Sequence, residues 1–240
     1  MRELQRALIT VADREFLPGL ERLDKSISER NSMHGVQKVL ISDDIEAFRD
    51  YRVIKPDEKL LEGIDCRSRF KKAFYKLLLF GMVEYDKILF VDSDVLCLGD
   101  IQMLLYGYDN LDFYAAKDDG VQLDNKYNSE FMRINSGVMV VNRIMIRPDV
   151  FTEMMSIARE NISYDGGDQG VINEYLYRNN VSFGYLPQIY NTLKRIYHHH
   201  KELWVKIHED IRLLHYVGAK PWAGGDEENY AELNRLWEQT

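Results

Sequence analysis

The chain has 240 residues, of which 45% are hydrophobic and 29% are charged, and this composition fits one globular domain with a core of its own. Its formal net charge of −8 argues against a general nucleic-acid-binding surface, which would be basic. The 2 cysteines, Cys66 and Cys97, are too few for a disulfide framework, so we expect reduced thiols.

Short apolar runs alternate with longer helical patterns along the chain, which is typical of an α/β fold with a mostly parallel central sheet flanked by helices. We expect strands at residues 7–11, 36–41, 87–91 and 136–141. We expect helices at residues 17–29, 67–83 and 148–161, and an amphipathic segment at 230–237. The composition shows no linker, so residues 1–240 are predicted to form a single domain.

Neither a membrane span nor a secretion signal is expected. No apolar run approaches the ~20 residues that cross a bilayer. The opening residues lack the apolar core of a signal peptide. These observations predict a cytoplasmic protein.

Two aspartates follow the predicted strand 87–91 directly, in the sequence Asp92-Ser93-Asp94. Residues i and i+2 of a strand face the same way, so both carboxylates are expected to reach one point at the carboxyl end of the sheet, where α/β domains bind ligands. Hard oxygen ligands there suit Mg²⁺ or Mn²⁺ together with substrate phosphates. The pattern favours a divalent metal site over the alternative, a pair of solvated acids in a turn.

A phosphatase with an aspartyl-phosphate intermediate is a rival interpretation of a strand followed by D-x-D, because the first Asp of that motif attacks phosphorus. That class has the motif near the N-terminus and a Thr two residues after the second Asp. Here Val95 and Leu96 follow Asp94, which counts against the phosphatase. Glycine-rich phosphate loops of the types G-x-x-x-x-G-K and G-x-G-x-x-G do not occur in the sequence.

A histidine near the C-terminus, His215, follows the apolar pair Leu213-Leu214. A lone histidine is usually structural, but a neutral imidazole beside two carboxylates also makes a divalent site. Downstream, Gly218 permits close backbone approach, and Lys220 offers a point charge to a leaving diphosphate.

The segment 165–170 packs two carboxylates and an amide between glycines. It is consistent with a helix start capped by Asp168 and equally with a sugar-binding loop. Asn135-Ser136-Gly137, ahead of the predicted strand 136–141, is similarly consistent with a plain turn or a binding segment.

Taken together, these segments resemble glycosyltransferase family 8, the glycogenin-like group of GT-A enzymes. Four motifs in family order carry the resemblance across most of the chain: Phe90 to Asp94, Ile134 to Met139, Asp165 to Gly170 and His215 to Trp222. The resemblance implies a single GT-A domain. It also implies a retaining, Mn²⁺-dependent transferase that moves a hexose from a UDP-sugar to a hydroxyl of a glycan or protein-linked acceptor.

The resemblance assigns each matching residue a role. The Mn²⁺ ligands, with Mg²⁺ as the other candidate ion, would be Asp92, Asp94 and His215. The phosphates would be bound by Gly218 and Lys220, and Lys76 would reach the diphosphate or the sugar. Ser93 would also belong to the donor-binding residues. The transferred hexose would be surrounded by Asn135, Ser136, Asp165, Asp168 and Gln169. Uridine would be contacted by Leu8, Thr10 and Phe16, the last where the family usually has a stacking Tyr.

Retention of configuration, a family trait, leaves two chemical routes open. Double displacement needs a nucleophile, for which Asp168 is the first candidate and Gln169 the second. In same-face attack, which we favour, the leaving phosphate oxygen accepts the acceptor's proton. Asp168 and Asp165 would then orient the sugar and stabilise positive charge at the anomeric carbon.

Donor sugar, acceptor and assembly are less defined. Glucose and galactose differ at one hydroxyl, and the family uses both. Self-glycosylation through Tyr197, close to the acceptor tyrosine of glycogenin, is one alternative; a sugar-nucleotide hydrolase or phosphatase and a catalytically inactive binding protein are others. Family relatives often form homodimers, for which the aromatic segment 185–197 is a candidate surface. The consecutive histidines at 198–200 are predicted to lie in a solvated loop or on a partner surface.

Overall fold

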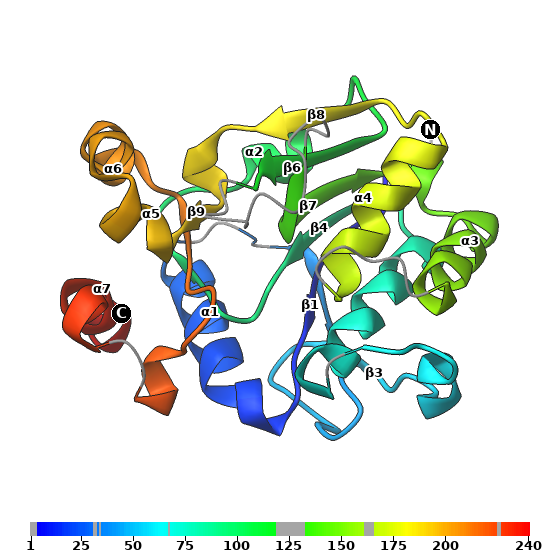
Figure 1. The fold of residues 1–240 in the computed structure, drawn as a ribbon, viewed down its shortest axis with the longest axis horizontal. Helices are drawn as coiled ribbons and strands as arrows, with labels where there is room; N and C mark the ends of the chain where they lie inside the picture. The colour runs from blue at the N-terminus through cyan, green and yellow to red at the C-terminus, as the bar shows by residue number, and fades with distance from the viewer. Residues whose placement is uncertain are drawn as a thin grey trace.

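The computed structural model describes residues 4–30, 33, 35–66, 68–118, 133–160, 166–224 and 227–240. A seven-stranded sheet with the order β3-β2-β1-β4-β7-β6-β8 forms the centre of the molecule (Figure 1). Its strands are β1 (Arg6–Val11), β2 (Gln37–Ile41), β3 (Arg52–Ile54), β4 (Lys87–Val91), β6 (Phe113–Lys117), β7 (Ile134–Asn142) and β8 (Phe183–Leu186). A smaller sheet, in the order β5-β10-β9, consists of β5 (Val95–Cys97), β9 (Thr192–Leu193) and β10 (Leu213–His215).

Most strand pairs of the larger sheet are parallel, as predicted. β3, β2, β1 and β4 are parallel to their neighbours, and β8 is parallel to β6. The exception is β7, which runs antiparallel to both β4 and β6. Every residue of β4 is buried, which explains its continuous apolar sequence. The predicted α/β architecture is confirmed.

Helices cover both faces of this sheet. The α-helices are α1 (Leu17–Glu29), α2 (Met103–Tyr106), α3 (Pro148–Arg159), α4 (Asp168–Arg178), α5 (Lys194–His199), α6 (Lys201–Ile207) and α7 (Glu227–Gln239). The 3₁₀ helices are η1 (Arg14–Phe16), η2 (Glu58–Leu61), η3 (Ser68–Gly81), η4 (Arg143–Met145), η5 (Gln188–Tyr190), η6 (His208–Asp210) and η7 (Pro221–Ala223). None of the helices in these described ranges is long and apolar enough to cross a membrane.

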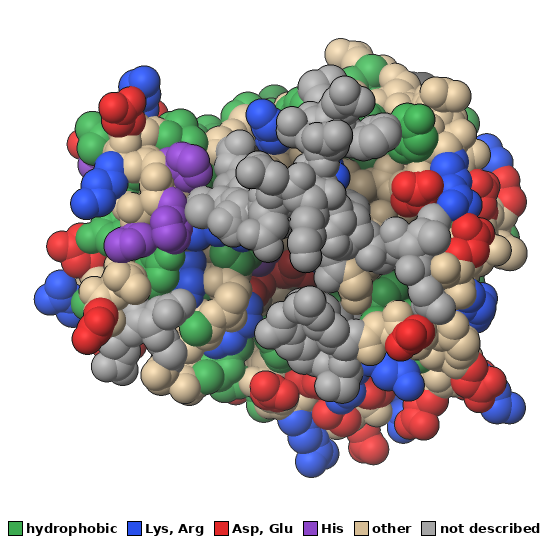
Figure 2. All heavy atoms as spheres, viewed as in Figure 1, with side chains coloured by type: hydrophobic (Ala, Val, Ile, Leu, Met, Phe, Trp, Pro, Cys, Tyr) green, Lys and Arg blue, Asp and Glu red, His purple; other side chains and the backbone are tan. Residues whose placement is uncertain are grey.

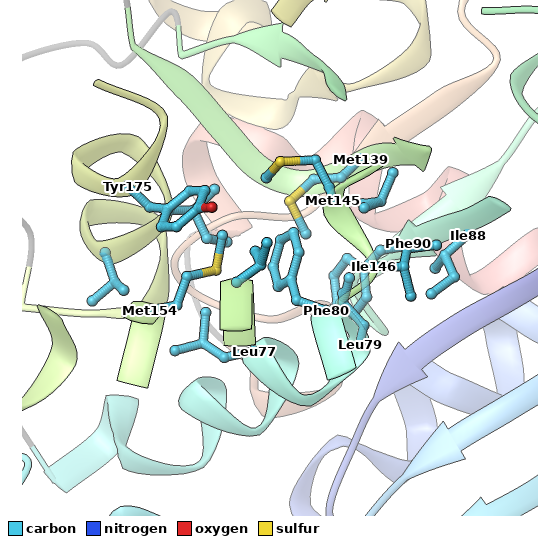
Figure 3. Packing of buried hydrophobic residues seen from close by; sticks show 14 of the residues in the cluster. Leu77, Leu79, Phe80, Ile88, Phe90, Met139, Met145, Ile146, Met154 and Tyr175 are labelled. Carbon is cyan, nitrogen blue, oxygen red and sulfur yellow. The ribbon is translucent and has the colours of Figure 1, made fainter. Parts of the chain in front are cut away.

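The main apolar cluster lies on the face covered by η3, α3 and α4. Figure 3 shows side chains of η3, such as Leu77 and Phe80, packing with Met154 of α3 and Tyr175 of α4. A second cluster joins α1 and α2 to the opposite face. A third buries Tyr216 and Trp237, and thereby attaches α7 to the segment after β10. Both cysteines are free, as predicted.

Two local predictions need correction. The segment predicted as an α-helix at 67–83 is the 3₁₀ helix η3; Phe74, Leu77 and Phe80, spaced three residues apart, are all buried, which matches the tighter winding. His198 and His199 end helix α5 instead of lying in a loop, although both are exposed. The aromatic residues between 185 and 197 are partly buried against the three clusters, and their part in a homodimer surface stays a prediction.

Candidate metal centre and sugar pocket

The Asp92-Ser93-Asp94 segment forms the turn between β4 and β5. The backbone N–H of Val95 donates to the carbonyl of Asp92 at 3.2 Å and closes this turn. The turn therefore brings the two carboxylates together. The prediction that they converge because alternate residues of a strand face the same way is wrong. Backbone bonds also tie the turn to Gly137 (Asp92 N–H to Gly137 O, 2.8 Å) and to Tyr216 (Tyr216 N–H to Asp94 O, 2.9 Å).

His215 joins the two carboxylates because β10 pairs with β5, which places His215 opposite Val95. Its Nε2 lies 3.2 Å from Asp94 Oδ1 and 3.8 Å from Asp92 Oδ2. One ligand atom from each of the three residues lies within 4.8 Å of the others. Two carboxylate oxygens and an imidazole nitrogen at these separations fit a divalent cation of the Mn²⁺ or Mg²⁺ kind.

Lys76 lies on the other side of Asp92, on η3, and its side chain is 4% exposed. Its ammonium is 3.0 Å from Asp92 Oδ1 and 2.8 Å from Asp168 Oδ2. Ser136 on β7 completes the group: its hydroxyl accepts from Lys76 at 3.1 Å and donates to Asp168 Oδ2 at 2.9 Å. The buried ammonium of Lys76 thus joins the turn at residues 92–94 to the start of α4.

Lys220 approaches Asp94 from the segment after β10. Its ammonium forms an ion pair with Asp94 Oδ2 and donates to the carbonyl of Tyr216 at 3.0 Å. The same ammonium lies 5.5 Å from the ring centre of Phe16, which packs edge-on against Trp222. A predicted phosphate-binding lysine and a predicted uridine-binding ring are therefore neighbours.

These contacts decide the charge states of the cluster. Burial raises the pKa of Asp92 above its ordinary value, although Lys76 opposes the shift. Burial also acts to raise the pKa of Asp94, but Lys220 and His215 outweigh it and hold that pKa well below its usual range. For Lys76, burial acts to lower the pKa, and Asp168 and Asp92 more than reverse the effect. At neutral pH Lys76 is therefore an ammonium and Asp94 a carboxylate.

A chain of hydrogen-bonded amides connects His215 of the cluster to Asp118. Gln169 Oε1 accepts from Asn135 Nδ2 at 3.0 Å and from the Ser136 N–H at 3.2 Å. Asn135 Oδ1 accepts from Asn191 Nδ2 at 2.8 Å, and Asn191 Oδ1 lies 2.9 Å from His215 Nδ1. At the far end, Gln169 Nε2 donates to Asp118 Oδ2 at 3.1 Å. Asn135, Ser136, Asp168 and Gln169, which were predicted to share one pocket, are brought together.

Asn191 and Asp118 in this chain, and Arg195, which contacts Asp118 at 3.4 Å, were missed by sequence reasoning. Asn191 follows a 3₁₀ turn in a run with no motif, and it meets Asn135 across 56 residues. No local spacing signals such a contact.

The remaining predicted residues differ in what the structure says of them. Thr10 is fully buried at the sheet, and its hydroxyl has no hydrogen-bond partner among the described residues, so its predicted contact with uridine stays a prediction. The side chain of Leu8 packs in the second apolar cluster, and its predicted contact with uridine stays a prediction. Gly218 has a φ of 79°, which suits glycine. Asp168 is the first residue of α4 and Gly167 is its cap, contrary to prediction. Asp165 lies outside the described residues.

Comparison with solved structures identifies the class to which this fold belongs. The galactosyltransferase LgtC in complex with donor and acceptor sugar analogues has a TM-score of 0.67 and 20% identity, with 96% of this chain and 95% of that chain covered. The glycosyltransferase GlyE of Streptococcus pneumoniae has a TM-score of 0.69 and 21% identity, with 98% and 60% covered. The fold is that of a GT-A glycosyltransferase.

Sequence comparison then gives the family. The model of glycosyl transferase family 8 matches residues 9–225, and the chain belongs to this family. Glycogenin-1 of Caenorhabditis elegans is 28% identical over 169 residues, covering 69% of this chain and 36% of that protein. Inositol phosphorylceramide glucuronosyltransferase 1 of Arabidopsis thaliana is 31% identical over 169 residues, covering 67% and 28%. The chain thus spans well under half of either relative.

Proposed function

We propose that the protein is a retaining, metal-dependent glycosyltransferase that transfers a hexose, glucose or galactose, from a UDP-sugar to a hydroxyl group. The observation that carries the proposal is the convergence of Asp92, Asp94 and His215 beside Lys76 and Lys220. A diphosphate bears several negative charges, and this cluster offers it a cation site flanked by two lysines. Figure 2 shows acidic side chains recessed near the middle of one face of the molecule.

Each side chain has a task in this proposal. A divalent cation held by Asp92, Asp94 and His215 would neutralise charge on the leaving diphosphate. Lys220, which pairs with Asp94 in this structure, would be released if that carboxylate held the cation, and its ammonium would then contact a phosphate oxygen. Lys76 holds Asp92 and Asp168 in place and keeps positive charge beside the scissile bond.

The contacts of Asp168 favour same-face attack over double displacement. Its Oδ2 is already engaged by Lys76 at 2.8 Å and by the Ser136 hydroxyl at 2.9 Å. A carboxylate oxygen shared by a cation and a donor is a weaker nucleophile, but it still stabilises positive charge at the anomeric carbon. Asn135 and Gln169 lie beside it and would bind hydroxyl groups of the sugar.

Gly137→Ala is expected to weaken Mn²⁺ binding by about 10- to 100-fold, the usual effect of misplacing a metal ligand. A Cβ at residue 137 would lie 2.2 Å from His215 Cε1 and 2.5 Å from Nδ1, so the imidazole must move away from the carboxylates. Titration with Mn²⁺, followed by electron paramagnetic resonance of the free ion, measures the change. Gly81→Ala is the control, because the atom nearest to its Cβ, on the Phe151 side chain, lies at an ordinary 3.5 Å. Equal Mn²⁺ affinity in both variants would contradict the assignment of His215.

Self-glycosylation at Tyr197 is the alternative suggested by the glycogenin relatives. The Tyr197 hydroxyl donates to Glu232 Oε2 at 2.7 Å, and the ring packs edge-on against Trp204 at 5.1 Å. Because the hydroxyl is engaged within the chain, we expect Tyr197→Phe to retain wild-type turnover and wild-type incorporation of labelled sugar into the protein itself. Loss of self-labelling in Tyr197→Phe, with UDP release intact, would instead identify Tyr197 as the acceptor.

A further inference from the structure

Asn191 is a fully buried amide that touches the candidate metal centre without being one of its ligands. Its exposed fraction is 0%, and it immediately precedes β9, the strand that pairs with β10. The pairing sets the Asn191 side chain beside His215 on one side and Asn135 on the other. A buried amide with one partner on each side has a defined direction of hydrogen bonding if either partner is unambiguous.

Two backbone N–H groups make that direction unambiguous. The Gly137 N–H lies 3.0 Å from the Asn135 side chain, and because a backbone N–H only donates, the Asn135 atom is its oxygen. The Ser136 N–H contacts Gln169 at 3.2 Å and likewise identifies the Gln169 oxygen, to which the Asn135 nitrogen donates. Both backbone N–H groups therefore indicate the same orientation of the Asn135 side-chain amide.

The orientation of Asn135 determines which nitrogen of His215 carries the proton. Asn135 Oδ1 accepts at 2.8 Å from Asn191, so the Asn191 atom facing it is Nδ2. The oxygen of Asn191 must therefore face His215 Nδ1, 2.9 Å away, and this nitrogen carries the proton. In the neutral imidazole, Nε2, 3.2 Å from Asp94 Oδ1, is then the nitrogen that keeps its lone pair and can bind a cation held between the carboxylates.

We propose that Asn191 is a positioning residue that holds His215 in the Nδ1–H tautomer and so presents Nε2 as a ligand. The proposal rests on the metal-binding role of His215 in the proposed function. Since Asn135 also orients Gln169, the same chain connects the metal ligand to the predicted sugar pocket. Histidine ligands commonly depend on such a partner for tautomer and ring orientation, and its loss costs about 10- to 100-fold in metal affinity.

Three variants separate this role from simple stability. Asn191→Leu removes the acceptor, whereas Asn191→Asp keeps an oxygen that accepts from Nδ1–H. Thr192→Val is the matched control: the neighbouring residue is equally buried, and its hydroxyl donates to Gln188 O at 3.0 Å without touching His215. All variants are checked for folding by thermal denaturation, and those with native transitions are compared.

The readouts are the His215 tautomer and the Mn²⁺ affinity. Two-bond ¹H–¹⁵N correlations of ¹⁵N-histidine-labelled, metal-free protein report the tautomer at a pH where the imidazole is neutral, with His215→Ala giving the assignment. We expect Nδ1–H in the wild type, Asn191→Asp and Thr192→Val. Asn191→Leu should lose that pattern and bind Mn²⁺ about 10- to 100-fold more weakly.

The proposal is overturned if Asn191→Leu keeps the wild-type tautomer, or if Thr192→Val and Asn191→Leu weaken Mn²⁺ binding equally. A His215→Ala variant that binds Mn²⁺ as the wild type does would refute the proposed metal role. The tautomer measurement, which needs no metal, would still decide the role of Asn191.

Discussion

Lys76→Met is expected to lower the free energy of unfolding of the metal-free protein by about 3–5 kcal/mol, the cost of removing one partner from a buried ion pair. Lys76 is 4% exposed and lies 2.8 Å from Asp168 and 3.0 Å from Asp92. Methionine fills a similar volume but leaves both carboxylates without their cation. Urea denaturation in the presence of a chelator measures the difference. Mn²⁺ should then stabilise this variant more than the wild type, because an ion at Asp92 replaces part of the lost charge.

Lys72→Met is the matched control, because Lys72 lies on the same helix η3. Its side chain is 44% exposed and its ammonium contacts Asp13 and Asp43, each at 3.1 Å. Exposed ion pairs contribute about 1 kcal/mol or less, so this variant should remain close to the wild type. Equal stability of the two variants would mean that Lys76 is not the electrostatic link between the metal-site turn and α4.

Asp168→Asn is expected to slow sugar transfer by about 10²- to 10³-fold, the effect of losing one preorganised charge that acts on the transition state. Asparagine keeps an oxygen for the Ser136 hydroxyl but loses the negative charge that we propose acts on the anomeric carbon. Since Asp168 is not among the three candidate metal ligands, UDP affinity in the presence of Mn²⁺ should change little. Calorimetry with UDP and a transfer assay with UDP-sugar separate the two effects.

Asp149→Asn provides the comparison, because Asp149 occupies the first turn of α3 as Asp168 does in α4. Asp149 is exposed, forms an ion pair with Arg147 and has no predicted role in transfer. It should leave both UDP affinity and transfer unchanged. A parallel fall in UDP affinity and transfer in Asp168→Asn would make Asp168 a structural residue of the α4 terminus.

The apolar periodicity of the chain was sufficient to predict much of the fold. The helix at 17–29 and the strand at 87–91 were predicted with the bounds that the structure shows, because long amphipathic or continuous apolar runs have one stable arrangement against a sheet. The antiparallel direction of β7 was not predictable in this way. A buried strand has the same composition in either direction.

The candidate site was predictable where a residue belongs to a local motif and not where it depends on tertiary contacts. Asp92, Asp94 and His215 stand at the ends of apolar strands, and the structure brings them together. The turn that brings the two aspartates together was not predicted, because the D-x-D sequence is the same whether it lies on a strand or in a turn. Asn191 was missed because its partners, Asn135 and His215, come from separate strands.

The most direct test of the central claim is the release of UDP from a panel of UDP-glucose, UDP-galactose and UDP-glucuronate, with and without Mn²⁺, by the wild type, Asp92→Asn and Asp94→Asn. Glucuronate is included because several relatives are named glucuronosyltransferases. We predict that the wild type releases UDP from glucose or galactose donors only with the metal, faster when an acceptor is added, and that both variants lose this turnover. Unaltered, metal-independent turnover in both variants would contradict the assignment of Asp92 and Asp94 as the metal centre of a glycosyltransferase.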